Sequence, residues 1–198
     1  KRCVESGLIH CVRLPEQAGD GPAPALIMLH GWGGDESSMW VFKQIIPAGA
    51  AAVTPRAPLQ LGENEFAWFR HGASRTRPEP ELLEEGLEYL NRFLDSLPDL
   101  YPVDPARLLL VGFSQGAAIG NGLTLTRPDR AIGIASLAGL MPELPKEKVD
   151  KSGLAGLPVF VAHGTKDHII PLEAAHRTRD VYRDFGAEVT YEEYDTGH

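Results

Sequence analysis

The chain has 198 residues, of which 43% are hydrophobic and 23% charged, and its formal net charge is −8. This composition is ordinary for one soluble globular domain spanning residues 1–198. No cluster of Lys and Arg could follow a phosphate backbone, and no apolar stretch reaches the roughly 18 to 20 residues of a membrane span. We therefore expect no nucleic-acid partner and no transmembrane segment, whereas composition sets no oligomeric state.

Two cysteines, Cys3 and Cys11, lie near the start of the chain on either side of a predicted turn at Ser6 and Gly7. They are too few and too close together for a disulfide framework, so we expect two reduced, packed thiols. Reduced thiols favour a cytoplasmic protein. Since the sequence starts with neither a Met nor a basic-then-apolar leader, we also expect a few residues to precede Lys1.

Short apolar or β-branched runs alternate with longer helical patterns along the chain. This alternation predicts an α/β fold, a mostly parallel sheet with helices on both faces. Several runs are apolar nearly throughout, as strands buried on both faces are. The predicted strands are Leu8–Leu14, Ala25–His30, Ala51–Thr54, Arg107–Phe113, Ala131–Ala138, Pro158–His163 and Glu188–Tyr194.

Four segments have helical periodicity, and the clearest of them is Pro80–Leu97. Its leucines recur at steps of three and four residues, and glutamates at its N-terminal end interact favourably with the helix dipole. The others are Ser37–Ile46, Gln115–Thr126 and Leu172–Phe185. Two segments without periodicity, 57–77 and 141–157, have a length typical of binding loops or lids.

The most informative segment runs from the strand ending at Phe113 through Gly112-Phe-Ser114-Gln-Gly116 into a helix. A nucleophilic hydroxyl must project from a strained turn, and glycines two positions before and after it leave room for the neighbouring backbone. The helix that begins after Ser114 favours negative charge developing beside it. A bare Gly-x-Ser-x-Gly match is common, but the strand before it and the helix after it indicate that Ser114 is a nucleophile.

A serine hydroxyl needs a base within hydrogen-bond reach, and the base needs a carboxylate to orient it. In folds with this elbow the chain order is serine, acid, histidine. His198 follows the last predicted strand, and Asp167 follows the strand that ends at His163, so both can reach the elbow. We predict Asp167 as the acid, with a helix cap as its alternative role, and His163 as a structural residue.

An acyl-transfer site also needs donors for the tetrahedral oxyanion, usually two backbone N–H groups. Gln115, directly after the nucleophile, is the expected source of one. The glycine-rich loop after the strand Ala25–His30 can turn a second amide inward, and Trp32 is the expected donor. A simple glycine-rich turn is the alternative interpretation of this loop, and His30 is expected to pack or hydrogen-bond beneath it.

Taken together, these motifs resemble the phospholipase/carboxylesterase family of small α/β-hydrolases, which includes acyl-protein thioesterases and bacterial carboxylesterases. The resemblance covers nearly the whole chain in order, and implies an eight-stranded-type core without a large cap domain. It also implies esterase activity with the roles given above, without a metal or organic cofactor. The motifs are Leu29-His-Gly-x-Gly-Gly-Asp35, Gly112-Phe-Ser-Gln-Gly116, His163-Gly-Thr-x-Asp167 with Pro171, and Gly197-His198.

The chain departs from the family pattern in two places. The family often has Trp-Phe-Asp in a loop that walls the site, whereas this chain has Trp68-Phe69-Arg70, so no role is carried over for that Asp. Trp68 and Phe69 are candidates for lining the acyl pocket, and packing is an equal alternative for them. Relatives also continue past the histidine into a terminal helix, which we expect to be truncated or unseen here.

The sequence thus predicts a serine hydrolase that cleaves carboxylic esters or thioesters of small to medium acyl groups through an acyl-enzyme, in a fairly open cleft. A non-catalytic binding protein that keeps the elbow as architecture is one alternative. A peptidase or acyltransferase with the same triad is another. The presence of all three triad members favours an enzyme.

Overall fold

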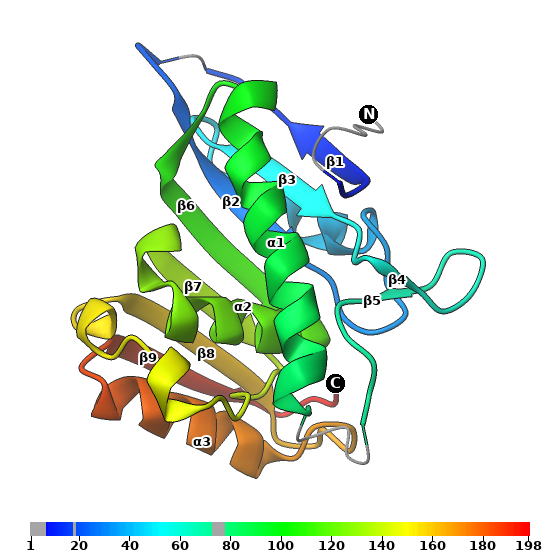
Figure 1. The fold of residues 1–198 in the computed structure, drawn as a ribbon, viewed down its shortest axis with the longest axis vertical. Helices are drawn as coiled ribbons and strands as arrows, with labels where there is room; N and C mark the ends of the chain where they lie inside the picture. Colours follow the sequence, from blue (N-terminus) through cyan, green and yellow to red (C-terminus); the bar gives the residue numbers. More distant parts are fainter. Residues whose placement is uncertain (1–6, 18, 73–77) are drawn as a thin grey trace.

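The main sheet has seven strands in the described residues, in the order β1-β3-β2-β6-β7-β8-β9 (Figure 1). The structure, a computed structural model, describes residues 7–17, 19–72 and 78–198. Strand β1 is antiparallel to β3, and the other pairs are parallel. All seven predicted strands are confirmed, with small shifts at their ends. They are β1 (His10–Arg13), β2 (Ala23–Leu29), β3 (Ala51–Pro55), β6 (Val103–Phe113), β7 (Gly133–Leu137), β8 (Pro158–Gly164) and β9 (Glu188–Tyr194).

The central strands of the sheet are apolar because both of their faces are covered. In β2, Ile27 and Leu29 belong to one hydrophobic cluster, whereas Leu26 and Met28 belong to a second cluster on the opposite face. Successive side chains of a strand point to opposite faces, so one apolar run feeds both clusters. The carboxyl end of β2 is thereby held firmly in place.

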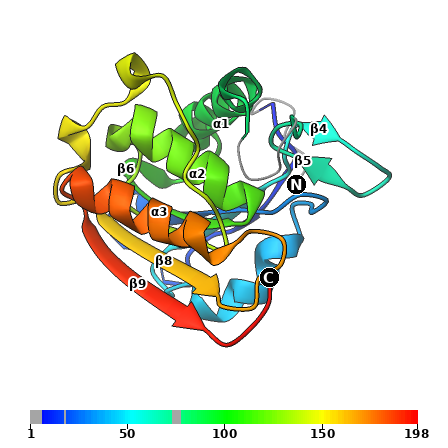
Figure 2. The ribbon, with the colours of Figure 1, turned by 90° about the horizontal axis from the view of Figure 1, so that it is seen from below.

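Three α-helices lie together on one face of the sheet, and the 3₁₀ helix η1 (Ser38–Ile45) lies on the other (Figure 2). The α-helices are α1 (Pro80–Leu100), α2 (Gln115–Thr126) and α3 (Leu172–Asp184). The four predicted helical segments are therefore confirmed, although the first forms a 3₁₀ helix.

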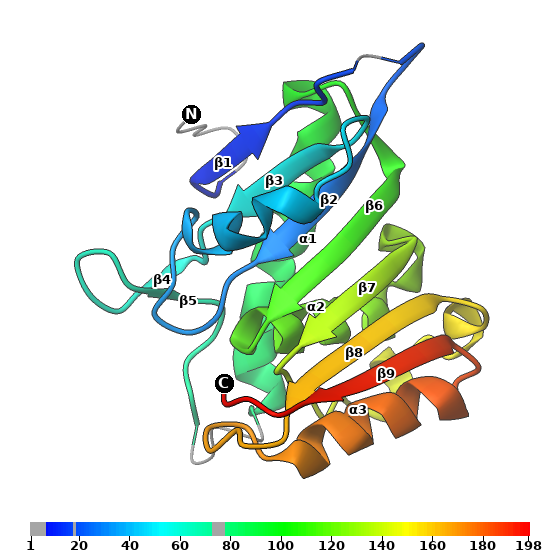
Figure 3. The ribbon, with the colours of Figure 1, turned by 180° about the vertical axis from the view of Figure 1, so that it is seen from behind.

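Chain direction explains the uneven coverage of the two faces. The chain crosses the sheet in one direction from β2 to β3 and in the other from β3 through β6, β7 and β8 to β9. Right-handed crossovers then put η1 on one face and α1, α2 and α3 on the other. In the described part of the chain, no helix covers β7, β8 and β9 on the η1 face (Figure 3). None of the described helices is long and apolar enough to span a bilayer.

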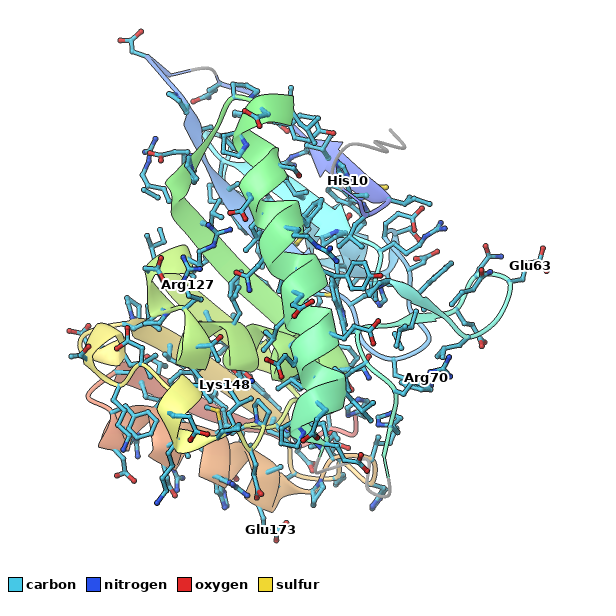
Figure 4. The ribbon with its side chains drawn as sticks, in the orientation of Figure 1. His10, Glu63, Arg70, Arg127, Lys148 and Glu173 are labelled. Carbon is cyan, nitrogen blue, oxygen red and sulfur yellow. The ribbon has the colours of Figure 1, made fainter. Side chains whose placement is uncertain are left out.

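The two segments without periodicity have different structures. Residues 57–72 include a short hairpin of β4 (Leu59–Gln60) and β5 (Phe66–Ala67), and Glu63 lies at its tip, away from the sheet (Figure 4). Strands of two residues are too short to produce a sequence period. The other segment contains the 3₁₀ turns η3 (Lys146–Lys148) and η4 (Ser152–Leu154), and it packs on the core through Leu154.

The structure describes only one of the two cysteines, so it tests the cysteine predictions only in part. Cys3 lies outside the described residues, as do residues 73–77 of the first segment. Cys11, on β1, is partly buried and forms no disulfide with a described residue. The expected reduced state of Cys3 stays a prediction.

Candidate active site

Ser114 lies at the junction of β6 and α2 in a strained backbone conformation. Its φ is +54° and its ψ −114°, a backbone conformation that residues other than glycine rarely adopt. A Cβ atom on Gly116 would overlap the carbonyl oxygen of Leu29, and one on Gly112 would overlap the carbonyl oxygen of Gly116. Both glycines are therefore required for the turn that projects the Ser114 hydroxyl at the carboxyl edge of the sheet.

His198 bridges Ser114 and Asp167. Its Nδ1 lies 2.6 Å from Oδ2 of Asp167, and its Nε2 lies 2.9 Å from Oγ of Ser114. An ionised carboxylate can only accept a hydrogen bond, so Nδ1–H donates to Asp167, and the lone pair on Nε2 accepts the Ser114 hydroxyl. This is the arrangement in which an imidazole can take a proton from serine.

The Asp167 side chain is fully buried behind His198. Its Oδ1 accepts the backbone N–H groups of Ile169 at 2.8 Å and Ile170 at 2.9 Å. Burial raises the pKa of Asp167, but the hydrogen bonds from His198 and the two N–H groups outweigh burial and hold this pKa below its usual range. Helix α3 begins after Pro171 without a side-chain cap, so the helix-cap alternative for Asp167 is wrong.

His163 is a second histidine that approaches the Asp167 carboxylate. Its side chain is fully buried, and its Nε2 is 2.9 Å from the carbonyl oxygen of Ile170 and 3.3 Å from Oδ2 of Asp167. Because the carbonyl oxygen only accepts, Nε2 carries a hydrogen and donates it to Ile170, with Oδ2 of Asp167 close to the same nitrogen. The predicted structural role of His163 is confirmed, and it includes a contact with the candidate acid that spacing alone did not indicate.

The glycine-rich loop after β2 lies beside Ser114. The backbone N–H groups of Trp32 and Gln115 donate to no other described residue, and both residues line the same pocket as Ser114. Below the loop, Nδ1–H of buried His30 donates to the Gly31 carbonyl at 2.7 Å, and its Nε2 accepts the N–H of Ala57 at 2.9 Å. Burial lowers the pKa of His30, which favours the neutral ring that these two bonds require. The structural role of His30 is confirmed.

The side chain of Gln115 has a second function that the sequence did not reveal. Its Oε1 accepts the N–H of Trp68, and its Nε2 donates to the carbonyl of Phe69, both at 2.8 Å. The indole N–H of Trp68 in turn donates to the carbonyl of His30 at 2.9 Å. The hairpin segment, the glycine-rich loop after β2 and the first turn of α2 are therefore joined beside Ser114.

These contacts separate the two aromatic residues that were candidates for lining the pocket. Phe69 lines the pocket beside Ser114, whereas Trp68 does not and is only 1% exposed. Packing, the alternative for Trp68, is the role in which the structure places it, because its ring fills the core and its N–H groups are engaged.

The active-site pocket has a cavity volume of about 210 Å³ and a mainly apolar lining. None of residues 141–157 lines it, so the structure brings no residue of the second aperiodic segment to the pocket. Apart from the predicted residues, its lining was not indicated by the sequence, because these residues come from several loops and helix starts. The lining residues are Gly31, Trp32, Phe69, His71, Phe113, Ser114, Gln115, Ala118, Leu140, Ile169, Ile170 and His198.

Residues 7–17, 19–72 and 78–198 contain no candidate metal site. Nowhere in these ranges do three or more His, Cys, Asp or Glu side chains form a group that could hold a metal ion. His163 and His198 both approach Oδ2 of Asp167, at 3.3 Å and 2.6 Å, but this set is not among groups that could hold a metal ion.

The sequence profile of the phospholipase/carboxylesterase family matches residues 15–198. The chain is 31% identical to acyl-protein thioesterase 1 of Kluyveromyces lactis over 182 residues, covering 83% of this chain and 78% of the relative. It is 32% identical to acyl-protein thioesterase 1 of Eremothecium gossypii over 171 residues, covering 78% of this chain and 72% of that protein.

Solved structures are similar over nearly the whole chain. The crystal structure of the Bacillus cereus carboxylesterase has a TM-score of 0.79 and 25% identity, covering 96% of this chain and 86% of that one. The structure of YahD with malic acid has a TM-score of 0.81 at 19% identity, covering 96% and 91%, which is a likeness of fold. The range that matches the family profile contains Ser114, Asp167 and His198.

Proposed function

The chain belongs to the phospholipase/carboxylesterase family, and from this premise we propose that it is a serine hydrolase of carboxylic esters or thioesters. The observation that carries the proposal is the position of His198, 2.9 Å from the Ser114 hydroxyl and 2.6 Å from the Asp167 carboxylate. In this proposal Ser114 is the nucleophile, His198 the general base and Asp167 the acid that orients it.

The first half of the reaction forms an acyl-enzyme. Oγ of Ser114 attacks the carbonyl carbon while Nε2 of His198 takes the hydroxyl proton, and a tetrahedral intermediate with a negatively charged oxygen results. The N–H groups of Trp32 and Gln115 stabilise this oxygen, assisted by the N-terminus of α2. The carbon–oxygen or carbon–sulfur bond then breaks, and His198 gives its proton to the leaving alcohol or thiol.

Water completes the cycle by the same route. It attacks the acyl carbon as His198 takes one of its protons, and Ser114 recovers that proton when the acid leaves. Asp167 stays ionised throughout, because its lowered pKa keeps it a carboxylate at neutral pH. It thereby stabilises the imidazolium that forms in each half of the reaction.

The pocket supports a substrate class of small to medium acyl groups. A dry apolar cavity of about 150 Å³ holds a benzene-sized molecule, and the pocket here has about 210 Å³ with Phe69, Ala118 and Leu140 among its lining. The relatives named acyl-protein thioesterase 1 favour thioesters as an alternative to oxygen esters.

Ser114→Ala tests the proposal. Turnover of nitrophenyl acetate or butyrate should fall by several orders of magnitude, because the triad acts as a unit. The fold should persist, since alanine keeps the Cβ of the elbow. Ser96→Ala, on α1 and outside the pocket lining, is the matched control.

A fluorophosphonate probe distinguishes the enzyme from a non-catalytic binding protein of the same fold. Labelling of wild type and not of Ser114→Ala is the expected result, because only an activated hydroxyl attacks phosphorus. Undiminished hydrolysis by Ser114→Ala, or an unlabelled wild type, would refute the proposal. A panel of acyl thioesters, lysophospholipids and peptides then assigns the preferred substrate and tests the peptidase and acyltransferase alternatives.

Location in the cell is part of the proposal. A cytoplasmic protein keeps its thiols reduced, and two cysteines, Cys3 and Cys11, are too few for a disulfide framework. Fractionation of cells that carry the tagged protein is the test, and recovery in the extracellular medium would contradict it.

A further inference from the structure

A second apolar groove adjoins the active-site pocket on the side of η1. Its cavity has a volume of about 250 Å³, and it shares Gly31, Trp32 and Phe113 with the active-site pocket. We call it the η1 groove. The η1 residues beyond Ser38 that line it are Met39, Val41 and Phe42.

The η1 groove offers almost no free polar side chain to a ligand. Its one hydroxyl, that of Ser38, donates to Oδ1 of Asp35 at 3.0 Å and accepts the Asp35 N–H at 2.9 Å, and the indole N–H of Trp32 is its other side-chain polar group. The rest of the lining is aliphatic, aromatic or glycine, so burial of apolar surface is the main gain for a ligand. Val41 is 76% exposed, so the groove opens to solvent at that edge.

Gly31, which lines the η1 groove, lies next to Ser114. A Cβ atom on Gly31 would lie 3.1 Å from Cδ1 of Phe113 and 3.2 Å from Cβ of Ser114. The Phe113 ring also contacts the His198 ring, with 5.0 Å between the ring centroids. A leaving atom that receives its proton from His198 therefore departs next to Phe113, at the boundary of the groove.

We propose that the η1 groove binds the apolar part of the leaving alcohol or thiol, so that preferred substrates carry apolar groups on both sides of the ester carbonyl. The inference rests on the proposed hydrolase function and deepens it. The acyl group stays bonded to Ser114 until water attacks, which suits the active-site pocket that holds both Ser114 and His198. The leaving group must escape first, which suits the groove with an open edge at Val41.

Two ester series separate the two sites. Methyl, butyl and hexyl acetate vary only the alcohol, whereas methyl acetate, butyrate and hexanoate vary only the acyl group. The unsubstituted alcohols are nearly equal in acidity, so chain length reports binding. Each fully buried methylene raises kcat/KM about fourfold, and we expect at least about a tenfold rise from methyl to butyl acetate.

Three matched substitutions of exposed apolar residues complete the design. Val41→Asp changes the η1 groove, Ile169→Asp changes the active-site pocket, and Ile45→Asp changes neither. Val41→Asp should reduce the tenfold rise of the alcohol series to less than about threefold and leave the slope of the acyl series unchanged. Ile169→Asp should do the reverse, and Ile45→Asp should match wild type in both series.

Three results would overturn the inference while the hydrolase function stands. One is an alcohol series that is flat in wild type, and another is one that is equally steep in Val41→Asp. The third is a Val41→Asp variant that flattens both series alike. If instead wild type hydrolyses no ester and is not labelled by fluorophosphonate, the proposed function itself fails, and the inference fails with it.

Discussion

The proposed nucleophile and its proposed base are held in place in two different ways. Ser114 is fixed by the backbone of a buried turn, and every residue of α2 before Thr126 is buried. His198 lies at the end of an exposed segment that follows the edge strand β9, and contacts with its neighbours hold it there. The N–H of Lys166 donates to the carbonyl of Thr196, so the His198 segment is hydrogen-bonded to the Asp167 loop.

This difference determines whether a substitution at each position affects stability or activity. At the elbow, neighbouring backbones touch and no atom can be added, so a change there disturbs the core itself. In the loops that hold Asp167 and His198, hydrogen bonds set the geometry, so a change there can abolish the proposed chemistry and leave the sheet intact. The predictions below test this separation.

Gly116→Ala should have the largest effect, because it breaks the elbow. The added methyl would overlap the backbone of Leu29 and His30, and strain of this kind exceeds the roughly 1 to 3 kcal/mol typical of an overpacked core. The protein should fail to fold or lose most of its unfolding free energy in urea. Gly122→Ala lies in the same helix, and its added Cβ would be 3.3 Å or more from neighbouring atoms. It should change stability by about 1 kcal/mol or less. Equal stability of the two variants would contradict the proposed rigidity of the elbow.

Asp167→Asn should abolish most activity with little change in fold. An amide that presents its NH₂ group to Nδ1 of His198 favours the wrong tautomer, and a change of this kind lowers kcat by about 10⁴-fold in a serine protease with the same arrangement. The measurement is kcat/KM on nitrophenyl acetate beside a thermal melt. Asp195→Asn, which alters an exposed partner of Lys166 in the same region, is the control. Activity within tenfold of wild type would show that Asp167 is not the acid.

His163→Phe should have an intermediate effect on activity. It removes the N–H that donates to the Ile170 carbonyl and lies 3.3 Å from Oδ2 of Asp167, and an ordinary hydrogen bond contributes about 0.5 to 1.5 kcal/mol. We expect kcat/KM to fall about 2- to 10-fold, with the acid limb of its pH profile moved to higher pH. His163→Gln, which can restore a donor, should recover part of the loss. A profile unchanged in the Phe variant would leave His163 a packing residue only.

The smallest effect should be in the pH dependence of stability. The folded-state pKa of Asp167 is lowered, so its contribution is complete above the unfolded-state pKa of about 3.9 and is lost as pH falls through the folded value. The stability difference between wild type and Asp167→Asn should be constant from about pH 5 to 7 and shrink below about pH 4. Urea unfolding at several pH values measures it. A difference that grows with acidity would contradict the sign.

Local patterns in the sequence determined the strands, the helices and the three residues of the candidate triad. Apolar runs, leucine spacing and the Gly-x-Ser-x-Gly turn each act over a few residues, so they can be recognised without knowing what packs against them. Strand ends place residues at the carboxyl edge of a parallel sheet. That rule was sufficient to select Asp167 and His198.

Only the tertiary structure decided how distant segments meet. Trp68 and Phe69 are adjacent and both aromatic, yet one fills the core and the other lines the pocket, because Gln115 and His30 bind the backbone and indole between them. The uneven helix cover follows from strand order, which no single segment contains. The η1 groove likewise forms where η1, the glycine-rich loop after β2 and Phe113 meet. Such features depend on packing between segments far apart in the chain, and no local pattern records that packing.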